Sequence, residues 1–506
     1  MKKILRYTLA AGLAALASAL PAHAGVIGAP FKAHVALTFN EGLYDAVGTW
    51  NGESSVLWVS SDGNTRMRRF NASGVALDAG DINFGNNPWN IDFDRLGNYV
   101  TVRSIPDGDS NGVFATVRNR SGVVVVPEFR VNPTIAGRQD GSALAVSPSG
   151  QFAVAWMDQT NGIVTLFVRA YNANGTPASP AISFNTAPGF VGGITDLEMD
   201  AAGNFVIGWI NYSQATSADS YVRRYSFGGI AQTSHILVSA GTANLQDGLR
   251  LGMNAQGQFA ACWNSWNVDG DSYSIHYQLF TAAAAKVGTE QRANVTTAGA
   301  QYQCDVGMMD NGSSLVIWNN NNRAAVPSSI PDTRLRQYNA NGTPFSASET
   351  VLPPAAGTFA LDLSHVGVDP AGNALIAWTG RSTTGTDTDV WVQRFRMDTA
   401  PATTALASGQ TVTGLSGVAA SWRYYQVNIP AGAASMTVSS NGPGVANPEL
   451  YLRLGAQPTT SAWDIRPAIA GPNETIIVNN PLVGEWYIGI YGQTAYSGLN
   501  LSFTRN

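Results

Sequence analysis

The chain has 506 residues, carries a formal net charge of −5 at pH 7, and has charged side chains at only 12% of its positions. A chain of this length is too long to fold around one ordinary hydrophobic core, so we expect more than one domain. The 53 glycines and the 10% of aromatic residues favour a β-rich exported protein. No cluster of basic residues occurs, which excludes nucleic acid and anionic membrane surfaces as partners.

Residues 1–24 have the pattern of a secretory signal peptide. Three basic residues stand among the first six positions, an apolar run occupies 9–20, and Ala-His-Ala at 22–24 fits a cleavage site. The apolar run is too short to span a bilayer, and no later stretch is long enough. We therefore predict a secreted protein, extracellular or periplasmic, with no transmembrane segment.

A short phrase recurs seven times over residues 31–397. It is clearest as SPSGQFAVAW (147–156), DAAGNFVIGW (200–209) and DPAGNALIAW (369–378). Each copy carries a landmark glycine, followed six residues later by tryptophan in six copies and by Arg103 in the other. The seven glycines are Gly52, Gly97, Gly150, Gly203, Gly257, Gly312 and Gly372. A period near 50 residues indicates a propeller or a solenoid.

Each copy reads as four short strands around a glycine turn. After the turn, apolar and small residues alternate with period two, which is typical of a strand. Four strands repeated seven times predict a seven-bladed β-propeller over 31–397, and the repeated tryptophans are expected to fill the space between blades. The seventh copy lacks a fourth strand. The segment 35–40 resembles the fourth-strand phrase at 181–185, so we expect it to complete the last blade and close the ring.

The two cysteines test this register. Cys262 precedes a repeated tryptophan in the fifth copy, and Cys304 lies on the first strand of the sixth copy. The strand faces predict that they meet between the two blades, where an oxidising compartment would permit a disulfide. Two buried free thiols are the alternative.

Three hairpin loops of the repeat region carry spaced acidic pairs. Such carboxylates can hold calcium, although aspartate and glycine are also simple turn formers. We expect no cofactor, with calcium the one metal that these loops suggest. The pairs are Asp107 with Asp109, Asp269 with Asp271, and Asp387 with Asp389. At the mouth of the propeller channel, Arg250, Asp305 and Asp362 either form a polar rim or merely solvate the channel.

The repeat stops before a proline-bearing linker at 398–410, and residues 411–506 have a different pattern. WRYYQVNIPAG (422–432), ELYLRLG (449–455), GEWY (484–487) and AYSG (495–498) follow one another. In this order they resemble the bacterial pre-peptidase C-terminal domain. The resemblance implies a small β-sandwich that serves export or attachment, often beside a secreted protease. Glu449 and Ile465 replace an aspartate and a cysteine of the family pattern, which removes support for a calcium site and for a local disulfide. Trp463 and Tyr496 are the candidate contact surface, with packing in the core or on a loop as the alternative for each.

No convincing catalytic motif accompanies that domain. The zinc-protease signature is absent, and the G-x-S-x-G match around Ser110 has a turn before it and a strand after it, where a nucleophile elbow needs a strand and then a helix. We therefore favour a non-catalytic, monomeric binding or surface-interaction protein whose partner is an extracellular polymer or surface. The alternative is a secreted hydrolase or lyase acting on polysaccharide at the channel mouth.

Overall fold

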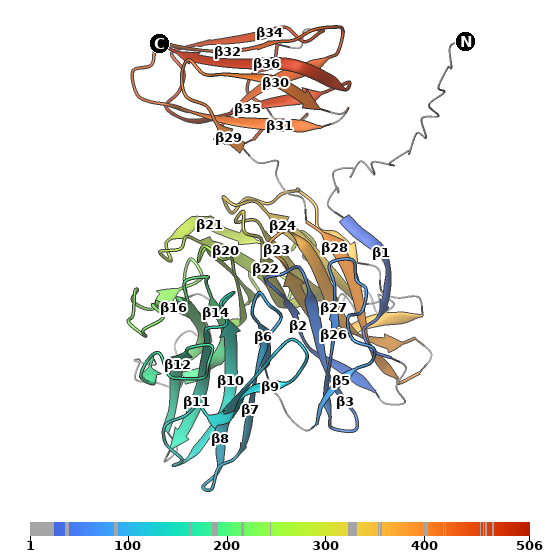
Figure 1. Cartoon of the computed structure of the whole chain (residues 1–506), viewed down its shortest axis with the longest axis vertical. Coiled ribbons are helices and arrows are strands. Elements are labelled where there is room, and N and C mark those ends of the chain that lie inside the picture. Colours follow the sequence, from blue (N-terminus) through green and yellow to red (C-terminus); the bar gives the residue numbers. More distant parts are fainter. Residues whose placement is uncertain are drawn as a thin grey trace, which may run out of the picture. The chain divides into compact units, whose positions relative to one another are not determined.

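The computed structural model describes residues 25–35, 40–85, 90–160, 163–184, 191–213, 217–242, 244–321, 331–352, 354, 357–383, 385–397, 403–417, 419, 421–455, 457–458, 460, 463–467 and 470–506. The predicted signal peptide at 1–24 lies outside this range. All regular elements in the described part are strands, and none is a helix (Figure 1). The chain divides into two compact units, 1–398 and 399–506.

The first unit contains seven four-stranded antiparallel sheets, numbered here in chain order. Sheet 1 comprises β2 (Glu41–Gly48), β3 (Ser54–Ser60), β4 (Thr65–Phe70) and β5 (Ile82–Gly85). Sheet 2 comprises β6 (Asn90–Phe93), β7 (Tyr99–Pro106), β8 (Asn111–Arg118) and β9 (Val124–Arg130). Sheet 3 comprises β10 (Arg138–Val146), β11 (Phe152–Thr160), β12 (Ile163–Tyr171) and β13 (Ile182–Ser183). Sheet 4 comprises β14 (Val191–Met199), β15 (Phe205–Ser213), β16 (Ser217–Tyr225) and β17 (Ile236–Leu237).

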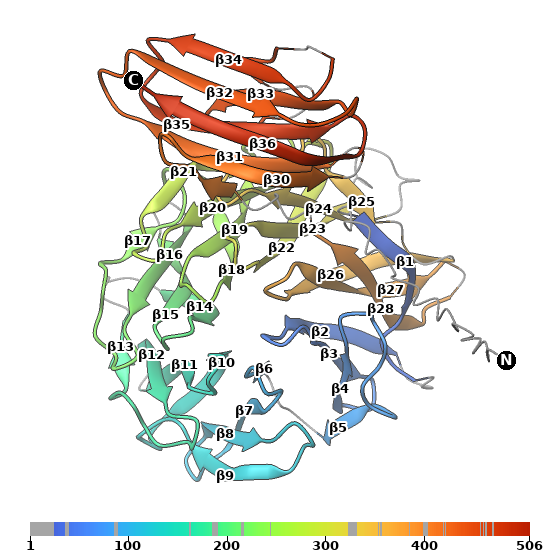
Figure 2. The ribbon, with the colours of Figure 1, turned by 45° about the horizontal axis from the view of Figure 1, so that its top comes forward.

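The remaining three sheets continue the same order, as Figure 2 shows. Sheet 5 comprises β18 (Gln246–Met253), β19 (Phe259–Trp266), β20 (Tyr273–Phe280) and β21 (Lys286–Arg292). Sheet 6 comprises β22 (Ala300–Met308), β23 (Ser314–Asn321), β24 (Asp332–Tyr338) and β25 (Thr350–Leu352). Sheet 7 comprises β26 (Thr358–Val368), β27 (Asn373–Ser382), β28 (Thr388–Arg396) and β1 (Gly25–Lys32).

The landmark glycines form the turn between the first two strands of each sheet. In sheet 4, the carboxylate of Asp200 accepts hydrogen bonds from the backbone of Ala202 and Asn204, and Gly203 has a φ of +84°. Glycine adopts this left-handed conformation without the steric cost that a side chain would bring. The repeated phrase is therefore a turn with its own side-chain cap, placed between two strands.

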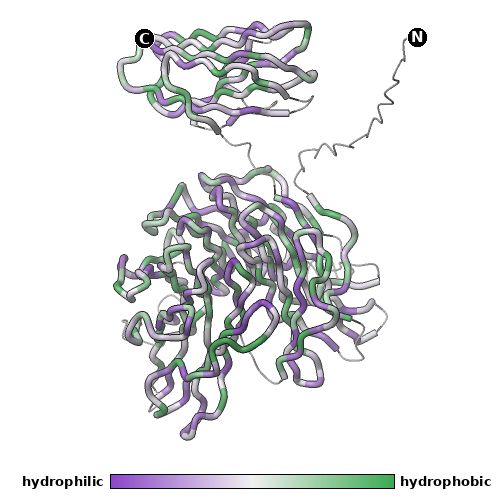
Figure 3. Tube along the Cα trace, in the orientation of Figure 1, coloured by the Kyte–Doolittle hydropathy of each residue, from purple (hydrophilic) through white to green (hydrophobic). Residues whose placement is uncertain are grey.

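Neighbouring sheets share hydrophobic cores. Seven clusters of buried residues each draw on two sheets, and together they link every sheet to the next and sheet 7 to sheet 1. All six repeated tryptophans are buried and pack against the preceding sheet in these clusters: Trp58, Trp156, Trp209, Trp263, Trp318 and Trp378. Figure 3 shows apolar and polar residues interleaved along the strands, as half-buried strands require.

The strand that completes sheet 7 is not the one predicted. β1 (Gly25–Lys32) pairs antiparallel with β28, from Gly25 opposite Arg396 to Lys32 opposite Trp391. The predicted strand at 35–40 falls largely outside the described residues, and it lies past this pairing. Ala33 donates its backbone N–H to Val390, just as Phe184 donates to Leu166 in sheet 3. In the structure Ala33 therefore takes the place of Phe184, whereas the sequence prediction had given that place to Phe39, six residues later. The first unit accordingly begins before residue 31.

Cys262 of β19 and Cys304 of β22 form a disulfide, with their Cα atoms 6.2 Å apart. Both lie in the cluster shared by sheets 5 and 6. The predicted bond and its position between neighbouring sheets are confirmed.

The second unit is a sandwich of two four-stranded sheets around one core. Sheet 8 contains β29 (Thr403–Ala405), β31 (Trp422–Ile429), β35 (Gly484–Gly492) and β33 (Pro448–Leu454). Sheet 9 contains β30 (Thr411–Gly417), β36 (Tyr496–Arg505), β32 (Ser435–Asn441) and β34 (Glu474–Asn479). β29 lies inside the segment predicted as a linker (398–410) and pairs in parallel with β31, so this unit extends further toward the N-terminus than the predicted 411–506.

Candidate functional site

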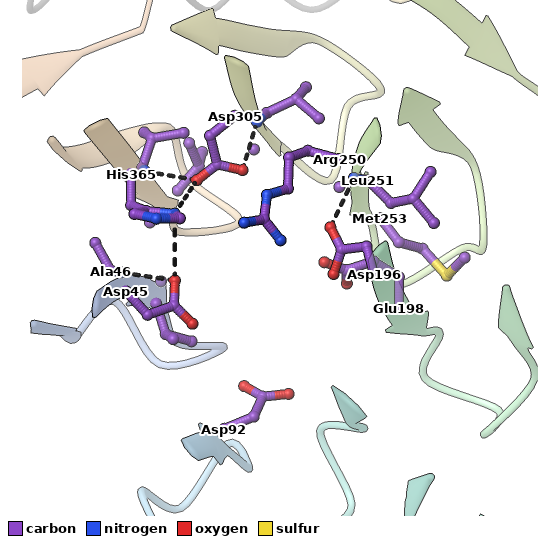
Figure 4. A pocket seen from close by; sticks show the side chains of 18 of the residues that line it. Asp45, Ala46, Asp92, Asp196, Glu198, Arg250, Leu251, Met253, Asp305 and His365 are labelled. Atoms are coloured by element: carbon purple, nitrogen blue, oxygen red, sulfur yellow. Dashed lines mark hydrogen bonds and ion pairs between the residues drawn. The ribbon is translucent and has the colours of Figure 1, made fainter. Parts of the chain in front are cut away.

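A pocket of about 440 Å³ lies where the innermost strands of the first unit converge. Every one of the seven sheets contributes its first strand to the lining. The charged residues among the lining are Asp45, Asp92, Asp196, Glu198, Arg250, Asp305, Asp310 and His365. Figure 4 shows most of these side chains directed toward one another from different sheets. A pocket with a few converging polar groups is the usual form of a small-molecule site.

Three of the aspartates link one sheet to the next. Oδ2 of Asp196 accepts the backbone N–H of Leu251 at 2.8 Å, and Oδ2 of Asp305 accepts that of Val366 at 2.9 Å. Asp92 makes the equivalent bond to Val146, at 2.5 Å. Each of the three also accepts the N–H of the residue that follows it. These carboxylates therefore connect neighbouring sheets as well as lining the pocket.

His365 is fixed by two carboxylates from different sheets. Its Nδ1 lies 3.3 Å from Oδ2 of Asp305 and 3.6 Å from Oδ1 of Asp45. The residue is only 7% exposed. Its Nε2 has no hydrogen-bond partner among the described residues, and the residue lines the pocket. The arrangement orients the imidazole and leaves its second nitrogen available to a ligand.

Arg250 and Glu198 are the pocket groups least engaged with the protein. The Arg250 guanidinium donates one hydrogen bond, to the carbonyl of Thr195 at 3.0 Å, and forms no ion pair within 4 Å among the described residues. The carboxyl of Glu198 has no hydrogen bond or ion pair to any described residue. Both groups are thus available for contacts that the protein itself does not make.

Burial raises the pKa of several of these carboxyls. The pKa of Asp92 rises to about 7 and that of Asp196 to about 6, because the charged forms lose solvation. The pKa of Asp45 is also raised, mainly by burial, with His365 opposing the shift. The pKa of Glu198 lies well above its usual value because of burial and then of the negative charge on Asp196 and Asp92. Burial in the pocket therefore disfavours the charged forms of these carboxyls.

The predicted polar rim is placed in part. Arg250 and Asp305 line the pocket, whereas the side chain of Asp362 lies outside the described part of the structure. Sequence reasoning missed Asp45, Asp92, Asp196 and Glu198, and it gave no functional role to His365. A signal was present. Seven residues before the landmark glycines stand Asp45, Asn90, Ala143, Asp196, Arg250, Asp305 and His365, mostly polar residues within otherwise apolar strands.

The predicted acidic pairs do not converge on the pocket or on one another. Asp109 accepts the backbone N–H of Gly137, and Asp271 accepts that of Gly299, so both bind the sheet that follows their own. Asp269 binds Asn294, and Asp389 binds Lys32 and His34. Asp107 lies 3.9 Å from Arg130, and Asp387 accepts a hydrogen bond from Ser382 through its backbone carbonyl. Among the described residues no group of three or more such side chains is placed to hold a metal ion.

A serine, a histidine and a glutamate do form a chain elsewhere in sheet 5. Nε2 of His276 lies 3.2 Å from Oγ of Ser274, and its Nδ1 lies 2.5 Å from Oε1 of Glu290. Ser274 is completely buried, and none of the three lines the pocket. A nucleophile must reach a substrate, so this chain is structural. Ser110 lies in the exposed turn between β7 and β8, with no such partners.

In the second unit, the two candidate contact residues differ. Trp463 is 44% exposed, whereas Tyr496 is only 5% exposed and belongs to the core. Core packing was the alternative for Tyr496, whose ring, at the start of β36, packs against Gly417 at the end of β30. Glu449, at the position of the family aspartate, is buried and binds Tyr451, Arg466 and Gln493.

Comparison with known proteins identifies this second unit. Residues 423–492 match the family described as the bacterial pre-peptidase C-terminal domain. The resemblance predicted from the sequence is confirmed over that range. The pre-peptidase C-terminal domain is also the part that curated relatives share with this chain.

An alkaline serine exoprotease A of Vibrio alginolyticus is 43% identical over 96 residues, which are 19% of this chain and 18% of that protein. A virulence metalloprotease of Vibrio anguillarum is 32% identical over 101 residues, 20% of this chain and 16% of that protein. The chain thus spans less than a fifth of the length of these relatives. Both matches are of domain size.

For the chain as a whole, the polysaccharide lyase Uly1 has a similar solved structure. It is 11% identical, with a TM-score of 0.45 over 70% of this chain and 90% of that one. A likeness this weak does not establish a shared fold or activity. Separately, no helix in the described residues is long and apolar enough to cross a bilayer.

Proposed function

We propose that the first unit is a seven-bladed β-propeller. Seven four-stranded sheets follow one another in chain order, and each interface between neighbours has its own hydrophobic cluster. The pairing of β1 with β28 supports closure, because the first and last parts of the unit join in one sheet. Such closure removes exposed sheet edges, which is the structural benefit of the architecture.

Deletion of residues 25–32 tests this architecture. Without β1, the edge of β28 is exposed and Phe31 is lost from the cluster shared by sheets 7 and 1. We expect the truncated mature chain to unfold at a clearly lower temperature than the full mature chain. Equal melting of the two would show that β1 does not close the ring.

We propose that the protein is an exported binding protein whose pocket holds an extracellular ligand, with the C-terminal domain serving export or attachment. One observation carries the binding function. The pocket brings together polar groups from six of the seven sheets, and Arg250 and Glu198 there are not saturated by contacts with the described residues. Export agrees with the signal-peptide pattern, with the disulfide, and with a shared domain in relatives that include an "Extracellular protease" of Xanthomonas campestris.

A screen of the purified mature chain on immobilised glycans and matrix proteins tests the binding function. Arg250→Ala is the matched variant, because it removes a pocket group whose single hydrogen bond is to a carbonyl. A ligand held by the wild type and weakened by this substitution supports the proposal. Binding that is identical in the variant, or that persists in the isolated C-terminal domain, places the ligand site elsewhere.

Turnover measured in the same screen tests the alternative, a hydrolase or lyase acting on polysaccharide. The observation that favours this alternative is His365, which two carboxylates orient in the pocket and whose Nε2 is left without a partner. Proton transfer needs such a fixed and available nitrogen. Turnover that is lost in His365→Gln would establish an enzyme, whereas binding without turnover supports the binding protein.

A further inference from the structure

The charge in the pocket is strongly unbalanced. Six carboxyls, on or beside strands of sheets 1, 2, 4 and 6, line the pocket together with one guanidinium and one imidazole. Asp92, Asp196 and Asp305 have a structural task, since each binds backbone N–H groups of two sheets. Glu198 has no such task. It is the carboxyl for which the described structure offers no internal explanation.

Glu198 stands at a different position along its strand from the position that Arg250 takes on its own strand. Glu198 and Asp92 each stand five residues before a landmark glycine, whereas Arg250, Asp305 and His365 stand seven residues before theirs. The strongest charges acting on Glu198 are those of Asp196 and Asp92, both negative. A positive group entering at this level would meet carboxyls before it met the guanidinium.

We propose that the pocket binds a ligand carrying an organic ammonium group, and that Glu198 is the residue that receives it. This inference rests on the proposed binding function of the pocket. Charge complementarity supports an ammonium group, because an unpaired carboxyl among other carboxyls gains most from a cation. Tyr44, which lines the same pocket and is 36% exposed, adds an aromatic ring of the kind that attracts such cations.

Two further groups define the rest of the ligand. Arg250 offers N–H donors that the protein leaves unused, and His365, itself more than nine-tenths buried, offers Nε2. Donors of this kind suit hydroxyl, carbonyl or carboxylate oxygens. The ligand therefore combines an ammonium group with oxygen acceptors on the other side, as an amino sugar does. A simple polyamine has the first feature without the second.

Titration calorimetry of the full mature chain, at neutral pH and low ionic strength, tests the inference. The matched probes are a tetramer of glucosamine and the same tetramer N-acetylated, which differ only in the ammonium charge. Spermidine and tetragalacturonate provide a polyamine and an anion. The variants are Glu198→Gln, which removes the proposed receptor, and Glu128→Gln, which removes a carboxylate paired with Arg103 on sheet 2 outside the pocket.

We expect the glucosamine tetramer to bind the wild type at least about tenfold more tightly than its acetylated form. Glu198→Gln should remove that preference, and Glu128→Gln should keep it. Tighter binding of spermidine than of the amino sugar would overturn the role of Arg250 and His365. Equal or tighter binding of the neutral or anionic probe overturns the ammonium assignment and leaves the pocket as a binding site. If no probe binds while the glycan screen still yields a ligand sensitive to Arg250→Ala, the ammonium assignment alone fails.

Discussion

Oδ2 of Asp305, on the first strand of sheet 6, accepts the backbone N–H of Val366, on the first strand of sheet 7, at 2.9 Å. Asp196 and Leu251 repeat this bond between sheets 4 and 5. A pocket carboxylate thus also fixes the position of the following sheet. In the described structure, neighbouring sheets are not paired through their strands, so such side-chain bonds supply hydrogen bonds between them.

Asp305→Ala should destabilise the first unit by about 2–3 kcal/mol. The change leaves two buried backbone N–H groups, of Val366 and Val306, without their acceptor, and it releases His365. Urea unfolding followed by tryptophan fluorescence measures the effect. Asp387→Ala in an exposed loop is the control and should change little. A loss below about 0.5 kcal/mol for Asp305→Ala would show that the bond contributes nothing to the link between sheets.

Glu198→Gln should stabilise the first unit at high pH only. The pKa of Glu198 is raised in the folded state, so the folded protein binds more protons than the unfolded chain between the ordinary glutamate value and the raised one. Stability is therefore lost as the pH rises through that window. The glutamine variant does not ionise. We expect equal melting near pH 4, and melting higher by about 2 °C or more for the variant near pH 8.

If the difference in melting temperature between the wild type and Glu198→Gln is the same at pH 4 and at pH 8, the raised pKa of Glu198 is contradicted. Glu128→Gln serves again as the control, because this carboxylate lies outside the pocket and is paired with Arg103. A side chain that lowers the stability of the fold and makes no hydrogen bond or ion pair within it is typical of a group kept for ligand binding.

The parts of the fold that repeat locally were predictable, and the parts that depend on distant residues were not. A glycine turn followed by Trp156 or Trp209 identifies a hairpin and its buried face within about ten residues. The closing strand was misplaced because the fourth-strand phrase at 181–185 is matched by 35–40 in the sequence, whereas the strand that pairs with β28 is Gly25–Lys32, which does not carry that phrase. The pocket was seen only in part, because Asp45 and His365 are separated by more than 300 residues and neither is unusual alone.

Replacing both cysteines by alanine should cost up to about 4 kcal/mol. The bond closes a loop with a sequence separation of 42, and cross-linking mainly limits the freedom of the unfolded chain. Unfolding of the double variant, compared with the oxidised wild type, measures the cost. Thiol labelling of denatured, unreduced wild type is the check on the bond itself, and two reactive thiols per chain would contradict it.

The repeated tryptophans should tolerate phenylalanine far better than alanine. The indole Nε1 atoms of five of them are buried without a hydrogen-bond partner in the described structure: Trp58, Trp156, Trp263, Trp318 and Trp378. Their role is therefore to fill volume between sheets, and each carries an unsatisfied donor that phenylalanine does not have. Trp318→Ala should cost about 3–5 kcal/mol through the cavity it leaves, whereas Trp318→Phe should cost about 1 kcal/mol, since relief of the buried N–H offsets part of the lost area. Trp486 is the control, because its Nε1 donates to the carbonyl of Leu482 at 2.9 Å. Trp486→Phe should cost more than Trp318→Phe when the unfolding of each unit is followed separately. Equal costs for Trp318→Phe and Trp318→Ala would contradict a role in filling volume, because phenylalanine fills most of the space that alanine leaves.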